Sequence, residues 1–323
     1  MPYNSIISRS DAAALIPEDV SAEILENLPT MNPLMQLARR LPDMSRAQRR
    51  LPVIGSFASA YFVSGDTGLK QTSDVTWENK YIDAEELAVI VPIPEAVLDD
   101  SDFDIWANVR PEIERALSRA ITAAVIYGTN IPASWTTNLG AAGIVAGSTA
   151  ASQTISAAAY TDLYEAILGE KANGDDGVFM NVEADGFMVT GSLAHPSMKG
   201  KLRNVRDTEG MPIFKTSMQL AGQYELDGTP LFFPTDGSMV AATSLMISGM
   251  WNQLVYAMRN DITYKVLDQA VITDAGGNIV YNLAQQDMIA LRAVMRLGFA
   301  LPNPPTYMNE TAATRFPFSD LTA

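Results

Sequence analysis

The sequence predicts an α+β protein in which one long helix accompanies several long strands. Three observations lead to this expectation. Apolar residues recur at spacings of three or four between residues 91 and 129, which is the period of one helix face. Two stretches rich in β-branched and aromatic residues, 51–63 and 74–93, flank a Gly-rich segment. The second half of the chain then alternates short helix and strand patterns.

Composition limits the kinds of protein that this chain can be. With 323 residues it can bury a large core or two subdomains. Its 37 acidic and 22 basic residues give a net charge of −15, which disfavours sequence-specific binding of nucleic acid because phosphate is repelled. Such a surface is still compatible with enclosing nucleic acid. There is no cysteine, which excludes disulfides, and neither a signal peptide nor a membrane span is expected.

The first 50 residues predict a polar arm and two short helices. Residues 1–16 are expected to become ordered only against a neighbour. Pro17 begins a predicted helix, PEDVSAEILENL, and Pro33 begins a shorter one. Five arginines follow, and they form either a solvated basic surface or a complement to carboxylates on another subunit. They are Arg39, Arg40, Arg46, Arg49 and Arg50.

The strands 51–63 and 74–93 predict a hairpin around the tip 64–73, SGDTGLKQTS, which carries Gly65, Gly68 and Lys70. No nearby sequence is available to cover both of its faces. Because an isolated hairpin is marginal in water, a partner subunit is expected to support this one.

The long helix is expected over residues 91–129. A cluster of carboxylates near its start would be favoured by the helix dipole, with Ser101 or Asp102 as the cap. Gly128 should end the helix, and Pro111 predicts a kink or a restart. The carboxylates are Asp99, Asp100, Asp102 and Asp104.

The remaining elements are predicted from shorter patterns. Irregular structure is expected at 132–159 and in the Pro-rich tail from 302 onward, and residues 285–301 fit either a helix or a strand. Helices are expected at 161–171 and 195–207; strands at 186–192, 226–237 and within 245–270; and a hairpin around 276–278.

The sequence lacks the residue combinations that catalysis needs. His195 is the only histidine, which leaves no imidazole cluster or catalytic dyad, and a structural or solvated role is expected for it. Neither G-x-x-x-x-G-K-[ST] nor G-x-G-x-x-G is present. The segment 98–104, LDDSDFD, could hold a hard cation, but carboxylates are common at helix starts for dipole reasons. The prediction is a non-enzymatic protein without cofactor or metal.

The order of these features resembles the major capsid proteins of tailed bacteriophages, whose fold is named after a Hong Kong coliphage. The resemblance is carried by PEDVSAEILE, PLMQLARRLPDM, LAVIVPIPEAVLDDSDFDI, HPSMKGKLRNVRDTEGMPIF, LDGTPLFF, MRNDITYKVLDQA and NLAQQDMIALRAVMRLGFALPNP. It implies an N-terminal arm with helices at 1–44, an extended β-hairpin loop at 45–91 and a peripheral domain built on a spine helix at 92–130. A mainly axial domain would follow at 131–244, and the closing strands of both domains with the tail at 245–323.

The resemblance also implies a function. Such subunits assemble as pentamers and hexamers into an icosahedral shell around double-stranded DNA, which they enclose without sequence-specific binding. The chain would then belong to the virion, assemble in the host cytoplasm and have scaffolding, portal and decoration proteins as further candidate partners. Some members crosslink a loop lysine to a neighbour's asparagine, which would assign Lys70 as the lysine and Asn303 or Asn309 as the acceptor.

Two alternatives to a phage shell are considered: an encapsulin-like compartment around an enzyme cargo, and an enzyme of unrecognised type. For the shell, the predicted intersubunit contacts are Arg46, Arg49, Arg50, Gly65, Gly68, Lys70, Asp99, Asp100, Asp102 and Asp104.

Overall fold

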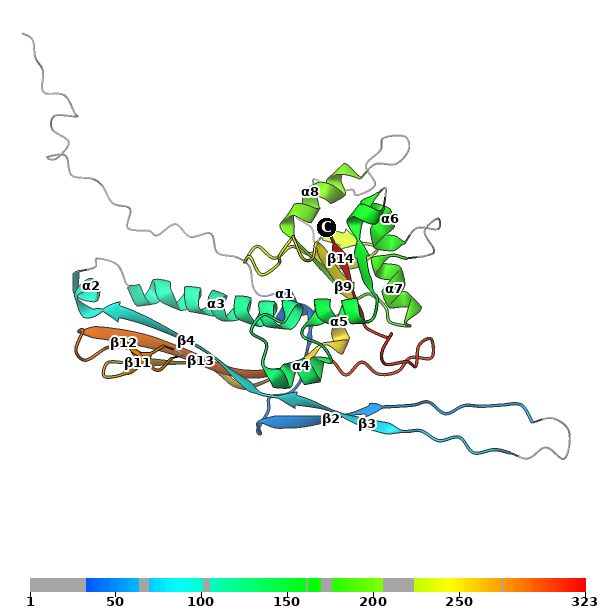
Figure 1. The fold of residues 1–323 in the computed structure, drawn as a ribbon, viewed down its shortest axis with the longest axis horizontal. Coiled ribbons are helices and arrows are strands. Elements are labelled where there is room, and N and C mark those ends of the chain that lie inside the picture. Colours follow the sequence, from blue (N-terminus) through cyan, green and yellow to red (C-terminus); the bar gives the residue numbers. More distant parts are fainter. Residues whose placement is uncertain are drawn as a thin grey trace, which may run out of the picture.

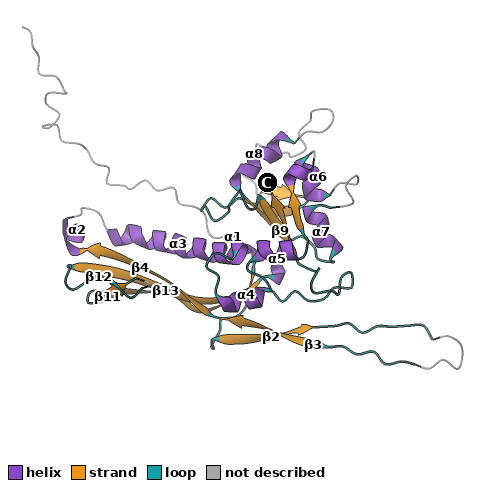
Figure 2. Ribbon diagram, in the orientation of Figure 1, coloured by secondary structure: helices purple, strands orange, loops and turns teal. Residues whose placement is uncertain are grey.

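The computed structural model describes residues 33–63, 70–100, 105–160, 162–169, 176–205, 224–274 and 276–323. They form a four-stranded sheet, a six-stranded sheet and a two-stranded hairpin that projects away from both (Figure 1). Helices and strands are mixed along the chain, as the α+β prediction requires (Figure 2). No described helix combines the length and the apolar character needed to cross a bilayer.

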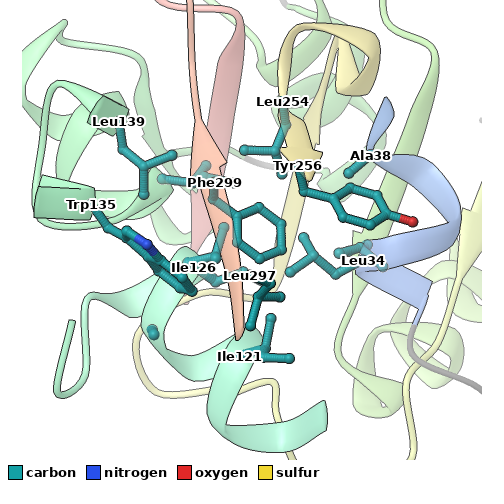
Figure 3. Packing of buried hydrophobic residues seen from close by; sticks show 14 of the residues in the cluster. Leu34, Ala38, Ile121, Ile126, Trp135, Leu139, Leu254, Tyr256, Leu297 and Phe299 are labelled. Carbon is teal, nitrogen blue, oxygen red and sulfur yellow. The ribbon is translucent and has the colours of Figure 1, made fainter. Parts of the chain in front are cut away.

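The four-stranded sheet has the order β1-β10-β13-β4. Its strands are β1 (Arg39–Arg40), β10 (Val255–Leu267), β13 (Met288–Ala300) and β4 (Glu85–Pro94). The long helix α3 (Ile105–Tyr127) covers one face of it, with the apolar stripe Ile113, Leu117 and Ile121 facing the strands. On the strand side of this core lie Leu297 and Phe299; Tyr256 stacks on the ring of Phe299, and Trp135 meets that ring edge-to-face (Figure 3).

The start of the long helix differs from the prediction. A separate helix, α2 (Glu95–Asp100), follows directly on the strand that ends at Pro94, so Asp99 and Asp100 lie in the last turn of α2 and not at the start of the spine helix. Ser101, Asp102 and Asp104 lie outside the described residues.

The long helix itself follows the prediction at its C-terminal end. It runs without a restart through Pro111, although a proline inside a helix removes one N–H donor and its ring crowds the carbonyl oxygen four residues earlier. It stops where Gly128 takes the left-handed conformation (φ 69°) that glycine adopts without strain.

The stretch 285–301, whose sequence fits either a helix or a strand, forms the strand β13 (Met288–Ala300). β13 is the central strand of its sheet and pairs with β10 on one side and with β4 on the other along nearly its whole length. Pairing on two sides overrides the helix propensity of its Ala, Leu and Met residues.

The six-stranded sheet has the order β5-β14-β9-β6-β8-β7 and a second hydrophobic core. Its strands are β5 (Thr154–Ser156), β14 (Phe318–Thr322), β9 (Met246–Gly249), β6 (Gly191–Ala194), β8 (Thr229–Phe232) and β7 (Tyr224–Leu226). The helices α6 (Leu163–Leu168), α7 (Val178–Ala184) and α8 (Pro196–Asn204) flank it.

Several predictions for this half of the chain are wrong. The single strand expected at 226–237 is instead the end of β7, a turn, and β8, which stops at Phe232. The tail is not a loop throughout, because its residues 318–322 form β14, a strand of the six-stranded sheet in which Phe318 and Leu321 are fully buried. Residues 132–159 contain α4 (Ala133–Leu139) and α5 (Ile144–Ala150), whose small residues hid their helical period. Strand β6 begins only at residue 191, so residues 186–190 are not a strand. The predicted hairpin around 276–278 is present, formed by β11 (Val271–Thr273) and β12 (Ile279–Asn282).

Near the N-terminus, α1 (Pro33–Leu37) confirms the short helix begun by Pro33. The helix predicted at Pro17 lies outside the described residues.

Candidate subunit-contact surfaces

The projecting hairpin consists of β2 (Gln48–Ile54) and β3 (Trp77–Asp83), paired antiparallel from Gln48–Asp83 to Ile54–Trp77. Its base is anchored by Ile82, which is fully buried beside Met44 and Ala257. Beyond the strands, polar bonds keep the two arms together. The predicted second strand, 74–93, is divided at Ala84, so residues 85–91 belong to the four-stranded sheet and not to the extended loop.

Large apolar side chains on this hairpin are exposed to solvent. Trp77 is 70% exposed, and its cross-strand partner Ile54 and the nearby Tyr81 lie on the same face with more than a third of their surface exposed. Farther out, Phe62 is completely exposed. Several large apolar side chains exposed on one projecting element indicate a surface that another molecule covers.

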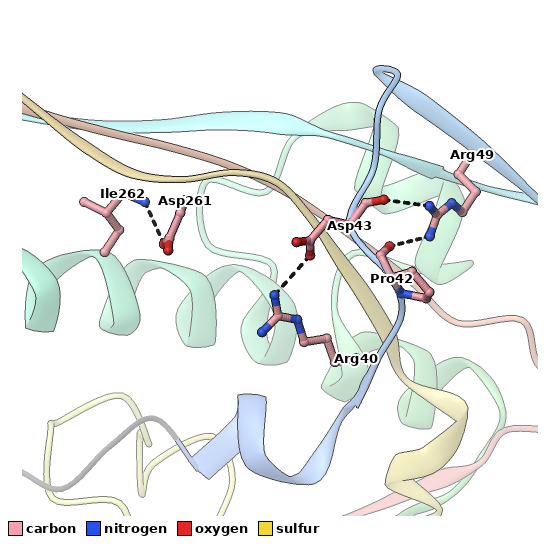
Figure 4. A network of polar contacts seen from close by, with 6 residues as sticks. All are labelled: Arg40, Pro42, Asp43, Arg49, Asp261 and Ile262. Atoms are coloured by element: carbon pink, nitrogen blue, oxygen red, sulfur yellow. Dashed lines mark hydrogen bonds and ion pairs between the residues drawn. The ribbon is translucent and has the colours of Figure 1, made fainter.

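The predicted basic contact residues divide into two groups. Arg49 donates to the carbonyl oxygens of Pro42 (2.6 Å) and Asp43 (2.9 Å), so it holds the entry to the hairpin (Figure 4). Arg46 and Arg50 are exposed, and neither has a hydrogen-bond or ion-pair partner among the described residues. Strand alternation explains why Arg49 and Arg50 differ, because adjacent residues of β2 point to opposite faces, whereas Arg46 precedes the strand.

The predicted acidic contact residues lie at the far end of the subunit. Asp99 and Asp100 are exposed in α2, which follows the C-terminal end of β4, whereas the hairpin joins β4 at its N-terminal end. The ten residues of β4 separate the two groups by roughly 33 Å. Pairing with Arg46 or Arg50 therefore requires a second subunit. Lys70 is exposed, and Gly65, Gly68, Asp102 and Asp104 lie outside the described residues.

A buried polar network, which the sequence analysis missed, fixes the segment between β13 and β14. The carboxylate of Asp185 accepts from Gln153 Nε2, from Asn309 Nδ2 (2.7 Å) and from the backbone N–H of Phe316 (2.9 Å). Arg315, only 4% exposed, donates to the carbonyl oxygens of two residues of the same segment. Gln153 lies 32 residues from Asp185, and Asn309 and Phe316 lie more than a hundred residues away, so no local pattern could have identified the network.

This network bears on the predicted crosslink acceptors. The Asn303 amide donates to the carbonyl oxygen of Arg315 (2.8 Å), and the Asn309 amide donates to Asp185. Both side chains thus hold their own segment in place. Between this segment and the hairpin lies a cleft of about 520 Å³, lined in part by Glu78, Lys80 and Arg315.

The lone histidine has a local structural contact. His195 precedes α8, and its Nδ1 accepts from the backbone N–H of Ser197 (3.1 Å), so it caps the helix. Within the described ranges, His, Asp and Glu side chains form no group of three or more that could hold a metal ion.

Comparison with known proteins supplies an independent line of evidence. The model of the phage capsid family matches residues 12–305. The major capsid protein of Staphylococcus phage 80alpha is 23% identical over 289 residues, covering 88% of this chain and 80% of that protein.

Solved structures agree with the sequence comparison. One from Microbacterium phage Oxtober96 superposes with a TM-score of 0.79 at 30% identity, covering 98% of this chain and 99% of the other. One from Mycobacterium phage Bobi gives a TM-score of 0.77 at 27% identity, with coverage of 98% and 99%. The capsid of a native GTA particle shares the fold at 17% identity, with a TM-score of 0.65 and coverage of 99% and 100%.

Proposed function

Because this chain belongs to the phage capsid family, we propose that it assembles as pentamers and hexamers into an icosahedral shell around double-stranded DNA. As a member of this family it is a major capsid protein of tailed phages, a structural and non-enzymatic component of the virion. The comparisons give no support to an encapsulin-like compartment. We further propose that assembly takes place in the host cytoplasm, with scaffolding, portal and decoration proteins as candidate partners.

The observation that carries the proposal is the exposed aromatic face of the β2–β3 hairpin. A two-stranded hairpin is only marginally stable by itself, and in a solitary subunit Trp77 and Tyr81 remain exposed to water. Docking on the neighbouring subunit would bury this face and supply the support that the hairpin lacks. In the arrangement that we propose, the four-stranded sheet with α3 forms the peripheral domain and the six-stranded sheet forms the axial domain. The net charge of −15 would keep packed DNA from adhering to the wall.

The first test is negative-stain electron microscopy with light scattering on the wild type and on the variant Trp77→Ala. Wild-type protein should give closed shells or rings of five and six subunits. Truncating a central aromatic anchor typically costs 2 kcal/mol or more per interface, about thirtyfold, so Trp77→Ala should give mainly unassembled subunits.

The matched control is Tyr164→Ala, which removes an exposed aromatic side chain from α6. Both variants should keep the unfolding free energy of the subunit within about 0.5 kcal/mol of wild type, since surface truncations rarely do more. Normal shells from Trp77→Ala would contradict the proposed role of the hairpin.

We also propose that Arg46 and Arg50 pair with Asp99 and Asp100 of a neighbour. The variant Arg46→Glu/Arg50→Glu should assemble poorly, and combining it with Asp99→Lys/Asp100→Lys should restore shells, because the pair is then reversed in sign. Arg49 is left unchanged because its contacts lie within the subunit. Loss of assembly without any restoration by the reversed carboxylates would refute this pairing.

A further inference from the structure

The face of the four-stranded sheet that α3 does not cover carries a group of cations. In β13, alternate residues such as Leu291, Ala293 and Met295 point into the core beneath α3. Arg292 and Arg296 therefore point to the opposite face, together with Val294 between them. At the end nearest the hairpin this face is covered by the Ile82 cluster, but farther along Lys265 of β10 remains exposed.

The strand register places two of these cations side by side. Lys265 lies directly opposite Arg292 in the β10–β13 pair, and on the other side of Arg292 lies Ile90, which is 40% exposed. Like charges at directly opposite positions destabilise a sheet. A subunit with 37 acidic and 22 basic residues nevertheless keeps this pair.

The described part of the subunit supplies no counter-charge to this pair. Arg296, one step along the strand, has Glu86 at 3.9 Å. Lys265 and Arg292 have no carboxylate within 4.0 Å among the described residues, and the Nε of Arg292 is shielded from solvent without a hydrogen-bond acceptor. An N–H that is desolvated and unpaired costs free energy, which an acceptor from outside the subunit would recover.

We propose that the Lys265–Arg292 pair is a docking site for carboxylates of a second copy of this chain. The inference rests on the proposed shell, which brings other copies against each subunit. Charge complementarity favours this occupant, since a second copy carries an excess of 15 negative charges and the pair lacks an anion of its own. The apolar Ile90 and Val294 beside the pair would lower the local dielectric around the contact and strengthen it.

The test compares the variant Lys265→Gln/Arg292→Gln with wild type. The variant removes the repulsion within the subunit, so the melting temperature of unassembled subunits should stay the same or rise by about 1–2 °C. The yield of sedimenting shells should fall about tenfold or more, because each contact in the shell loses a charge pair. A role confined to the folding of the subunit would not move these two readouts in opposite directions.

The matched control is Lys201→Gln/Arg203→Gln, which removes the same charge from the exposed end of α8 and should assemble like wild type. Normal shells from the Lys265→Gln/Arg292→Gln variant would overturn the inference, as would equal losses in both double variants. The absence of shells from the wild type would instead count against the proposed function itself.

Discussion

The buried carboxyl group of Asp320 predicts that the stability of the subunit depends on pH. Asp320 lies in β14, inside the six-stranded sheet, and its side chain is fully buried. One carboxyl oxygen accepts from the Ser244 hydroxyl, while Oδ2 has no hydrogen-bond partner in the described structure. Burial raises the pKa of Asp320 from 3.8 to about 7, and the bond from Ser244 opposes this rise in part.

The sign of the pH effect follows from linkage. The folded state holds the Asp320 proton more tightly than the unfolded state, so its contribution to stability is fully present below pH 3.8 and is lost as the pH rises through about 7. At about 1.36 kcal/mol for each pKa unit, the whole interval corresponds to about 4 kcal/mol. Between pH 5 and pH 8.5 the expected loss is about 3 kcal/mol.

The variant Asp320→Asn should remove this pH dependence while keeping an acceptor for Ser244. Its extra buried N–H groups cost about 1–3 kcal/mol at every pH. Through the raised pKa of Asp320, the wild type has lost about 2 kcal/mol at pH 5 and about 4 kcal/mol at pH 8.5. The variant should therefore be close to wild type in stability at pH 5 and about 1–3 kcal/mol more stable at pH 8.5. Urea unfolding of unassembled subunits, followed by circular dichroism across this range, measures the difference between the two curves.

Two controls isolate the titrating group. Ser244→Ala removes the bond that favours the charged form, so the pH at which stability is lost should move upward. Glu225→Gln changes an exposed carboxylate in β7 and should leave the pH profile unaltered. Parallel profiles for wild type and Asp320→Asn would refute the argument, because Asp320 would then not titrate in this range.

The remaining predictions concern packing and the buried network. Gly249→Ala should cost about 3 kcal/mol of unfolding free energy because the new Cβ would overlap the carbonyl oxygen of Pro317, whereas Gly200→Ala, with open space within α8, should gain about 0.5–1 kcal/mol. Thermal unfolding of the two variants measures these changes. An unchanged melting temperature for Gly249→Ala would contradict the close packing of Gly249 against Pro317. Asp185→Ala should cost roughly 3 kcal/mol or more by leaving the groups around it unpaired, and it should expose the segment before β14 to limited proteolysis. An unchanged cleavage pattern would show that Asp185 does not hold that segment.

Much of the fold could be predicted because periodicity reports the buried face of an element. The apolar face of α3, the end of that helix at Gly128 and the β11–β12 hairpin could all be predicted from the sequence. Strand β13 was ambiguous because its composition favours a helix, and only pairing with two distant strands decides its conformation. Strand β14 was missed for a similar reason, since its partners β5 and β9 lie far away in the sequence.

The contact residues show where a charge pattern stops being informative. The five arginines were grouped because they are close in the sequence, yet Arg49 is bound within the subunit while Arg50, its immediate neighbour, faces solvent. The two-residue period of a strand makes this division unavoidable once β2 is known to be paired. The Lys265–Arg292 pair shows the converse, because two cations 27 positions apart become neighbours only through the register of β10 and β13. In both cases the sequence supplies the charge, and strand pairing determines whether that charge is used within the subunit or left for another copy.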